Sequence, residues 1–279
     1  MNQKNIKVLK SNGEMVDFMP DKLKSALMRS GADAKEAESI VNTVISSIGE
    51  RTKTGKIYKI AYNLLKQKSK YVAGRFRLKQ AVYDLGPSGY PFEKYVSKLL
   101  EYQGYKVKVN IIENGACVKH ELDVVAENNE ERLMIECKFH RDKGHKNDVK
   151  IPLYIHSRFL DIKASWEKSG DSKLNYFGMI VTNTRFSEDA TEYGKCTGMR
   201  LVSWDYPHGN SLKDWIDRAD LHPITSMNSL TKLQRQSLLD SGVVLCKEIV
   251  ENHDVLLKLG LRLQKRDEVI KEAEVLSGS

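Results

Sequence analysis

The sequence has no long apolar run and few cysteines. No stretch approaches the ~20 consecutive apolar residues that a membrane-spanning helix needs, and Met1–Lys10 lacks the apolar stretch of a signal peptide. The four cysteines, Cys117, Cys137, Cys196 and Cys246, are widely separated and show no CxxC spacing. A zinc ribbon or a disulfide scaffold is therefore not expected. We expect a cytoplasmic protein from a reducing compartment, with no membrane partner.

The sequence also lacks the phosphate-binding loop of nucleotide motors. That loop requires Gly-x-x-x-x-Gly-Lys followed by Ser or Thr. The nearest match, Thr54-Gly55-Lys56, has neither the upstream glycine nor the downstream hydroxyl residue. Internal repeats and low-complexity tracts are absent as well. A P-loop motor and a repeat protein are both excluded.

The chain does have a basic excess, and it is unevenly distributed. With 279 residues, 41% of them hydrophobic and 29% charged, the chain suits one large globular domain or two ordinary ones. The net charge is +8, but residues 1–85 hold 17 Lys+Arg against 8 Asp+Glu, and the other 194 hold 28 against 29. The first third is therefore either the part that binds a polyanion or a lysine-rich, solvated helical surface.

Local patterns divide the chain into three parts. Residues 6–18 alternate as a hairpin around Asn12-Gly13, and helical periodicity then runs to Leu85 in four helices, the last over 72–85. The segment 86–91 holds two Gly and two Pro and marks a boundary. We predict a domain over 1–86, a second over 90–206, and a helical region over 211–279.

The second domain reads as α/β, so that the protein is α+β overall. The order is a helix, a three-strand meander, a helix, a strand, a helix and a strand, which predicts a central mixed sheet. The expected strands are 105–112, 118–126, 132–139, 176–182 and 199–204, and the expected helices are 92–103, 152–168 and 187–195.

Two of these strands carry residues typical of a metal-dependent active site. Glu136 and Lys138 are two apart and share one face of a strand, whereas Cys137 points to the other face. If strands 118–126 and 132–139 pair as a hairpin, Asp123 lies beside Glu136. Two carboxylates suit Mg²⁺, and a neighbouring lysine can orient an attacking water for phosphodiester hydrolysis. Alone, the pattern also fits an ion pair on an exposed strand edge, but its apolar flanks favour the site.

This arrangement resembles the PD-(D/E)xK nuclease superfamily, in particular its Mrr-like restriction endonuclease branch, from about Tyr90 to Trp204. The resemblance implies that Asp123, Glu136 and the main-chain carbonyl of Cys137 bind the metal and that Lys138 acts at the nucleophilic water. Glu93 matches an acidic residue on the first helix that can hold a second metal or its water. One departure is Leu122, where the family often has proline.

Three histidines lie close to this motif. His120 is expected to pack, because it faces away from Asp123, whereas Glu121 shares the face of Asp123. His140 and His145 lie in a basic stretch that we interpret as a phosphate-contacting loop, with a merely solvated loop as the alternative.

The first 85 residues resemble the ATP-cone, a nucleotide-binding regulatory domain. The resemblance rests on the segments Val8–Gly13, Asp21–Leu23, Thr54–Ile57 and Ala73–Lys79. It implies a triphosphate held near the hairpin and a base near apolar residues. The implied contacts are Lys10, Asn12, Gly13 and Lys22 for the triphosphate, and Val8, Thr54 and Ile57 for the base.

Together these patterns predict a Mg²⁺-dependent, Mrr-like (type IV) DNA endonuclease with ATP or dATP as an allosteric ligand. DNA and a nucleoside triphosphate are the expected partners, and a dimer or larger homo-oligomer is expected because a double-strand cut needs two sites. Two alternatives stay open: a nucleotide-sensing DNA-binding regulator with an inactive nuclease fold, and a structure-selective DNA-processing nuclease. The C-terminal helices are expected to pack or dimerise, with DNA binding as a further alternative.

Overall fold

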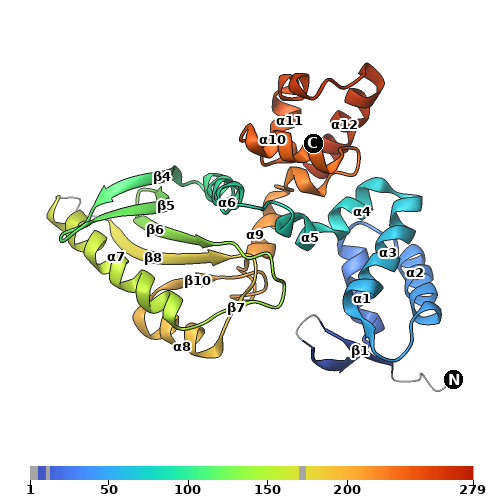
Figure 1. Cartoon of the computed structure of the whole chain (residues 1–279), viewed down its shortest axis with the longest axis horizontal. Helices are drawn as coiled ribbons and strands as arrows, with labels where there is room; N and C mark the ends of the chain where they lie inside the picture. Colours follow the sequence, from blue (N-terminus) through green and yellow to red (C-terminus); the bar gives the residue numbers. More distant parts are fainter. Residues whose placement is uncertain (1–5, 11–12, 170–173, 279) are drawn as a thin grey trace.

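The computed structural model describes residues 6–10, 13–169 and 174–278. Figure 1 shows a small helical part at one end, coloured blue, and a twisted sheet with its helices at the other. The C-terminal helices, coloured red, lie above the junction between them. The protein is an α+β structure with a central mixed sheet, as predicted.

A three-stranded sheet opens the chain, in the order β2-β1-β3. β1 (Lys7–Leu9) and β2 (Met15–Asp17) pair antiparallel with Val8 opposite Val16, which confirms the predicted hairpin. Of its predicted turn residues, Asn12 lies outside the described residues. β3 (Thr52–Lys53) runs parallel to β1. The sequence did not predict β3, because two residues are too few for a periodic signal.

Four helices pack beside this sheet: α1 (Pro20–Arg29), α2 (Ala34–Ser47), α3 (Thr54–Lys68) and α4 (Lys70–Phe76). Their apolar stripes form one hydrophobic cluster with Val8 of β1. Asp33 caps α2 by accepting a hydrogen bond from the Glu36 amide. The predicted helical periodicity of this part is thus confirmed up to α4.

The predicted helix over 72–85 is wrong in one respect. The backbone turns at Arg77, so that α4 ends at Phe76 and α5 (Leu78–Tyr83) begins as a separate helix. The reason is packing. Ala73 belongs to the hydrophobic cluster of the first four helices, whereas Leu78 belongs to the cluster that joins the main sheet to α6 and the C-terminal helices. One straight helix cannot present its apolar residues to two cores in different directions.

The main sheet has five strands in the order β10-β8-β6-β5-β4. They are β4 (Lys106–Asn114), β5 (Lys119–Glu127), β6 (Glu131–Lys138), β8 (Asn175–Thr182) and β10 (Arg200–Val202). β4, β5 and β6 pair antiparallel, whereas β6, β8 and β10 pair parallel. The predicted meander and mixed sheet are both present.

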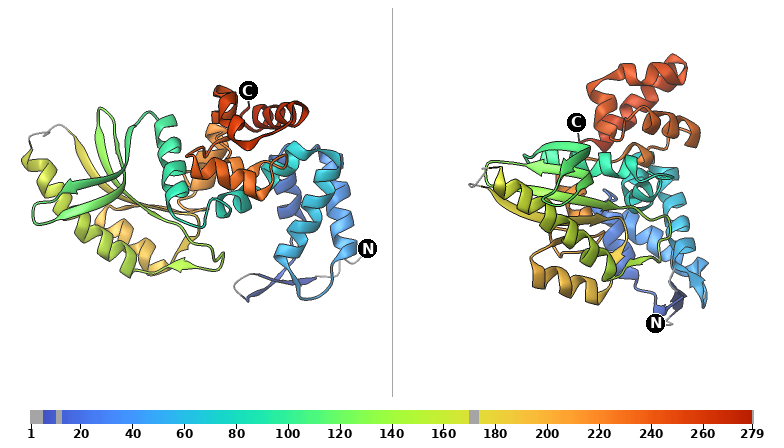
Figure 2. Two further views of the ribbon diagram at one scale, coloured as in Figure 1. Left: turned by 45° about the horizontal axis from the view of Figure 1, so that its top comes forward. Right: turned by 60° about the vertical axis from the view of Figure 1, so that its left-hand side comes forward.

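Helices cover both faces of this sheet (Figure 2). α6 (Tyr90–Tyr102) and α9 (Leu212–Ala219) share one hydrophobic cluster with one sheet face. α7 (Lys150–Lys168) and α8 (Glu188–Thr197) form another with the opposite face. A two-stranded parallel ribbon of β7 (Lys146–Asn147) and β9 (Arg185–Phe186) lies beside them.

The C-terminal region is helical, as predicted, but in short pieces: η1 (Ile224–Ser226), α10 (Lys232–Asp240), α11 (Cys246–Glu251), η2 (His253–Leu259) and α12 (Leu263–Leu276). Its apolar residues join the same cluster as α6, and the buried Tyr95 hydroxyl donates to the Leu221 carbonyl at 2.8 Å. This region therefore packs against the sheet domain. Among the described residues, no helix is both long and apolar enough to cross a membrane.

Candidate active site

The two carboxylates singled out by the sequence lie where two strands part. The antiparallel pairing of β5 with β6 ends at Val124 opposite Ile135. β6 continues to pair with β8 as far as Lys138. Asp123, next to Val124, and Glu136, next to Ile135, lie just beyond this last β5–β6 pair, one on each strand of the fork. The Cys137 amide donates to Asp123 Oδ2 at 2.7 Å. The predicted neighbourhood of Asp123 and Glu136 is confirmed.

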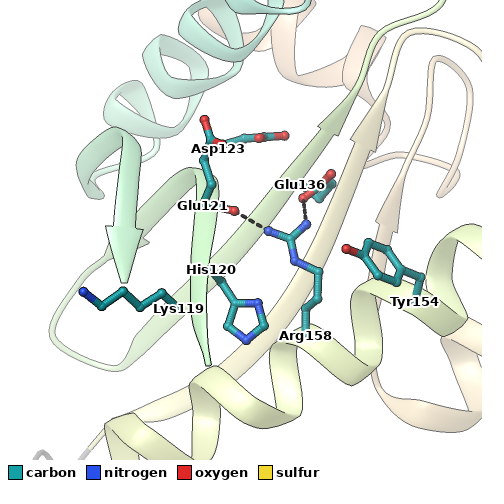
Figure 3. A pocket seen from close by; sticks show the side chains of 7 residues that line it. All are labelled: Lys119, His120, Glu121, Asp123, Glu136, Tyr154 and Arg158. Carbon is teal, nitrogen blue, oxygen red and sulfur yellow. Dashed lines mark hydrogen bonds and ion pairs between the residues drawn. The ribbon is translucent and has the colours of Figure 1, made fainter. Parts of the chain in front are cut away.

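A polar pocket of about 360 Å³ opens at the fork. Figure 3 shows the side chains of β5 and β6 facing those of α7 across it. Its lining residues are Lys119, His120, Glu121, Asp123, Glu136, Tyr154 and Arg158. The pocket is open to solvent on one side, which suits a large substrate more than an enclosed small molecule.

Glu136 is the central anion of the pocket, and its side chain is only 8% exposed. Lys138 Nζ donates to its Oε1, and Arg158 Nη1 donates to its Oε2 at 2.8 Å. Arg158 also donates to the Glu121 carbonyl and lies 5.7 Å from the ring centre of Tyr154 (Figure 3). Two cations therefore neutralise one buried carboxylate, as buried charges require.

Arg158 was missed at the sequence level. It lies on the stripe of α7 that faces the sheet, one turn after Ile155 and beside Phe159, both of which are buried. A charged residue within an otherwise apolar stripe needs a buried partner, and that was the available signal. The identity of the partner was not readable, because Glu136 lies 22 residues away.

Burial and mutual repulsion disfavour ionisation of the other two carboxylates. The pKa of Asp123 rises to about 6, chiefly through burial and then through the charge of Glu136. The pKa of Glu93, on α6, rises to about 7 through burial and the charge of Asp123, against a hydrogen bond from Asn110. Crowded carboxylates of this kind are stabilised by a bound cation.

Asn110 is a second residue that the sequence did not reveal. It has φ +51°, and the β4–β5 pairing skips it: Val109 pairs with Val124 and Ile111 with Leu122. Asn tolerates this left-handed conformation better than most residues. The distortion lies opposite Asp123, and the Asn110 side chain bonds to Glu93. Backbone strain of this kind is common at functional sites.

The donor set at the fork fits a hard divalent cation. Within 6–10, 13–169 and 174–278, no three His, Cys, Asp or Glu side chains form a ready-made metal cage. Mg²⁺ does not require one, because it commonly uses one or two carboxylates, several waters and substrate phosphates. The Cys137 thiol is buried in the cluster on the α6 side, so that only its carbonyl could serve.

His120 contacts α7, but it also lines the pocket with Asp123, so the expectation that it faces away from Asp123 is wrong. Its Nε2 lies 2.7 Å from Asp161 Oδ2. The Cys117 and Val118 amides also donate to this carboxylate, at 2.7 and 3.2 Å. These bonds, the His120 contact first among them, lower the pKa of Asp161 to about 2. Asp161 thereby ties the β4–β5 turn to α7 at the rim of the pocket.

The loop after Lys138 is anchored by a buried polar network. The Asn183 side chain exchanges two hydrogen bonds with the His140 backbone, at 2.9 and 2.8 Å. His140 Nε2 contacts Asn147 Oδ1 at 2.8 Å, and the fully buried Asn147 donates to Thr182 Oγ1 at 3.2 Å. His140 and His145 stack at 3.7 Å between ring centres. The loop is therefore anchored at His140 and Asn147, whereas Arg141, Lys143 and Lys146 between and beside them are exposed to solvent.

The proposed nucleotide contacts of the first domain are spread over its small sheet. Lys10 pairs with Glu14 at 2.9 Å, and Gly13 has φ +85° in the turn. Lys22 is exposed in the first turn of α1, and Thr54 is the first residue of α3. Lys10 and Gly13 thus lie at the turn of the hairpin, and Lys22 and Thr54 lie at the starts of two helices.

Val8 and Ile57 differ from the other implied nucleotide contacts. They are only 2% and 3% exposed and pack in the hydrophobic cluster of the first four helices. Both side chains are part of the hydrophobic core. Almost none of their surface is accessible, so it is not available for contact with a base. Asn12 lies outside the described residues.

Comparisons with known proteins agree with a nuclease assignment for the middle of the chain. Residues 86–152, which include Glu93, Asp123, Glu136 and Lys138, match the family model Mrr_cat, restriction endonuclease. Residues 222–277 match the family model AF1548-like, C-terminal. No match of these models covers the first 85 residues.

One protein from Archaeoglobus fulgidus, named "Uncharacterized protein", is 38% identical over 184 residues, which are 66% of this chain and 100% of that protein. A solved structure, titled "Crystal Structure of Protein of Unknown Function AF1548", has a TM-score of 0.56 at 38% identity. The match covers 69% of this chain and 100% of the chain in that structure. The chain therefore belongs to the AF1548-like family, in which it carries a restriction-endonuclease-like segment ahead of the family's C-terminal region.

Proposed function

We propose that the protein is a metal-dependent DNA endonuclease of the Mrr-like, type IV kind. The observation that carries the proposal is the fork between β5 and β6, where Asp123 and Glu136 line an open polar pocket and Lys138 donates to Glu136. Asp123, Glu136 and the Cys137 carbonyl are the proposed Mg²⁺ ligands. Glu93, with its raised pKa, would hold a second ion or its water.

Bound Mg²⁺ would lower the pKa of a water and stabilise the charge of the phosphodiester during attack. Lys138 lies against Glu136 and carries donors that can hold the attacking water in line. Arg158 donates to the same carboxylate from α7 and holds it at the fork. Asn110 holds Glu93 at the edge of the site.

The substrate that fits this pocket is a DNA backbone. The pocket is open and polar, and it lies beside the basic stretch that follows Lys138. The part of the chain that the structure describes has one such fork. A double-strand cut therefore requires two chains, and we propose a dimer or larger homo-oligomer working in the cytoplasm. A structure-selective nuclease would share this site and differ only in substrate.

We further propose that ATP or dATP binds the first domain and regulates cleavage. Lys10, Gly13, Lys22 and Thr54 are the proposed contacts, together with Asn12. Support comes from the basic excess of residues 1–85 and from α1 and α3, whose N-termini have no side-chain cap. A route to the rest of the protein exists, because the Tyr62 hydroxyl of α3 donates to Asn228 of the C-terminal region.

The decisive experiment is plasmid cleavage by Asp123→Ala, on methylated and unmethylated DNA, with Mg²⁺ and with or without ATP and dATP. We expect loss of at least 100-fold in rate, as for removal of a group that acts on the reacting atoms (about 2.7 kcal/mol or more). Asp189→Ala, which removes an exposed carboxylate of α8, is the matched control. Full cleavage by Asp123→Ala would refute the proposal, and DNA binding without any cleavage by the native protein would favour the regulator alternative.

A further inference from the structure

Four cationic side chains gather outside the fork, where three separate segments meet. Lys79 comes from α5, Lys143 from the loop after β6, Lys146 from β7 and Arg185 from β9. Lys146 and Arg185 are register partners in the β7–β9 ribbon. We call these four residues the junction cluster.

Aromatic side chains hold two of these cations in place. Lys79 Nζ lies 5.3 Å from the ring centre of Trp204, and Lys143 Nζ lies 5.5 Å from that of Tyr83. Lys143 also donates to the Gln80 side chain of α5. Both rings are largely buried, so the amino groups are fixed on a rigid platform rather than free in solvent.

The charge of the junction cluster is only partly compensated. Arg185 pairs with Asp205 at 2.8 Å, and Asp142 is the other acidic group close by. Lys79 has no ion pair with any residue that the structure describes. Burial, followed by the charges of Arg185 and Lys143, lowers the pKa of Lys79 to about 8. A bound anion would relieve this repulsion.

The junction cluster lies within reach of the proposed scissile bond. Lys143 follows Lys138 by five residues, which span at most about 17 Å. The network of Asn147, His140 and Asn183 fixes this loop against the end of β8. Successive base pairs of a duplex rise about 3.4 Å. Lys143 therefore lies no farther from Lys138 than about five base steps of a duplex.

We propose that the junction cluster binds the phosphates of duplex DNA on one side of the cleavage site, with α5 contributing to the DNA-binding surface. The position relative to the cut rests on the proposed nuclease function, but the binding itself does not. A set of lysines and one arginine whose charge is only partly compensated is suited to backbone contacts that carry no sequence preference.

Binding is tested on the full-length chain with a fluorescent 30-bp duplex in EDTA, where no metal-dependent cleavage occurs, at several KCl concentrations. Lys79→Gln and Lys143→Gln should each lower the slope of log K against log salt by about 0.9. At 0.15 M salt each should weaken binding by about 5-fold, and the double variant by about 30-fold. Near 1 M salt the variants should bind like the native protein.

The matched control is Lys106→Gln with Lys168→Gln. It removes the same charge at the opposite end of the sheet, where β4 begins and α7 ends. An unchanged slope in the cluster variants, or an equal fall in the control, would overturn the inference. Because Lys79 is half-buried, Lys143→Gln with Lys146→Gln, both exposed, provides a second double variant if Lys79→Gln does not fold.

The same variants separate this inference from the proposed function. If the slope falls as expected while the native protein never cleaves DNA, the junction cluster stands and the nuclease proposal fails. If Asp123→Ala abolishes cleavage but the salt dependence of the cluster variants equals that of the native protein, the nuclease proposal stands and the junction cluster fails. Displacement of DNA by ATP from the native protein but not from the cluster variants would assign the cluster to a free triphosphate and overturn the inference.

Discussion

Replacing Arg158 with methionine should destabilise the metal-free protein and strengthen its response to Mg²⁺. Methionine keeps most of the aliphatic length that packs beside Tyr154 but removes the charge that Arg158 brings to Glu136. Glu136 would keep only Lys138 as a partner, although its side chain is 8% exposed. In the native protein the guanidinium and the proposed Mg²⁺ would compete for the same carboxylate.

The magnitude follows from these contacts. Breaking a buried ion pair by removing one partner costs about 3–5 kcal/mol when the remaining charge is left alone. Here Lys138 remains, so we expect about 2–3 kcal/mol, including the lost bond to the Glu121 carbonyl. At about 2–4 °C per kcal/mol, the midpoint of thermal unfolding should fall by about 4–12 °C without metal.

The assay is thermal unfolding in EDTA and over a Mg²⁺ titration. The variant should recover more of its midpoint with Mg²⁺ than the native protein gains, because the ion replaces the missing positive charge. Arg141→Met, at an exposed position of the loop, is the matched control. Equal midpoints in EDTA, or a smaller Mg²⁺ response in the variant, would refute the assignment of Glu136 as both an Arg158 partner and a metal ligand.

Three further predictions concern stability and order. Asn110→Gly should keep the fold, since glycine accepts φ +51°, yet lower cleavage by freeing Glu93, whereas Asn110→Ala should cost about 1 kcal/mol more in urea unfolding. The pKa of the buried His222 is lowered to about 4, mainly by burial. The unfolded chain therefore takes up the proton first, and stability should fall from about pH 6.5 downward, by about 2 kcal/mol at pH 5. His222→Gln should remove that loss. The same fall of unfolding free energy below pH 6.5 in the variant and the native protein would contradict this prediction. Asn147→Ala should remove the side-chain partner of His140 and one of several bonds to Thr182. We expect faster tryptic cleavage of the 139–147 loop, with no such change for Asn128→Ala.

The sheet and the two carboxylates were predictable because they depend on local pattern. Alternation along β5 and β6 fixes which residues share a face, and a short turn fixes the register. Asp123 therefore had to meet Glu136 once the hairpin formed. The structure confirms both the register and the neighbourhood.

The residues that complete the site were not predictable, for two physical reasons. Arg158 depends on which helix stripe covers which end of the sheet, and this is a tertiary property. Asn110 depends on a left-handed backbone that no periodicity signals. The break between α4 and α5 at Arg77 is likewise a tertiary property, as is the position of Arg158. Periodicity identifies apolar residues but not the core that each of them joins, and here neighbouring residues join different cores.

That break also changes the meaning of the charge distribution. Counted along the chain, the basic excess belongs to residues 1–85, and the sheet domain is near neutral. In space, however, α5 leaves the first helices and lies against Trp204 and the loop that carries Lys143. Part of the basic excess that was assigned to a nucleotide-binding domain therefore lies beside the loop that follows Lys138. The proposed junction cluster would then let the near-neutral sheet domain bind a polyanion with cations that come partly from the preceding segment.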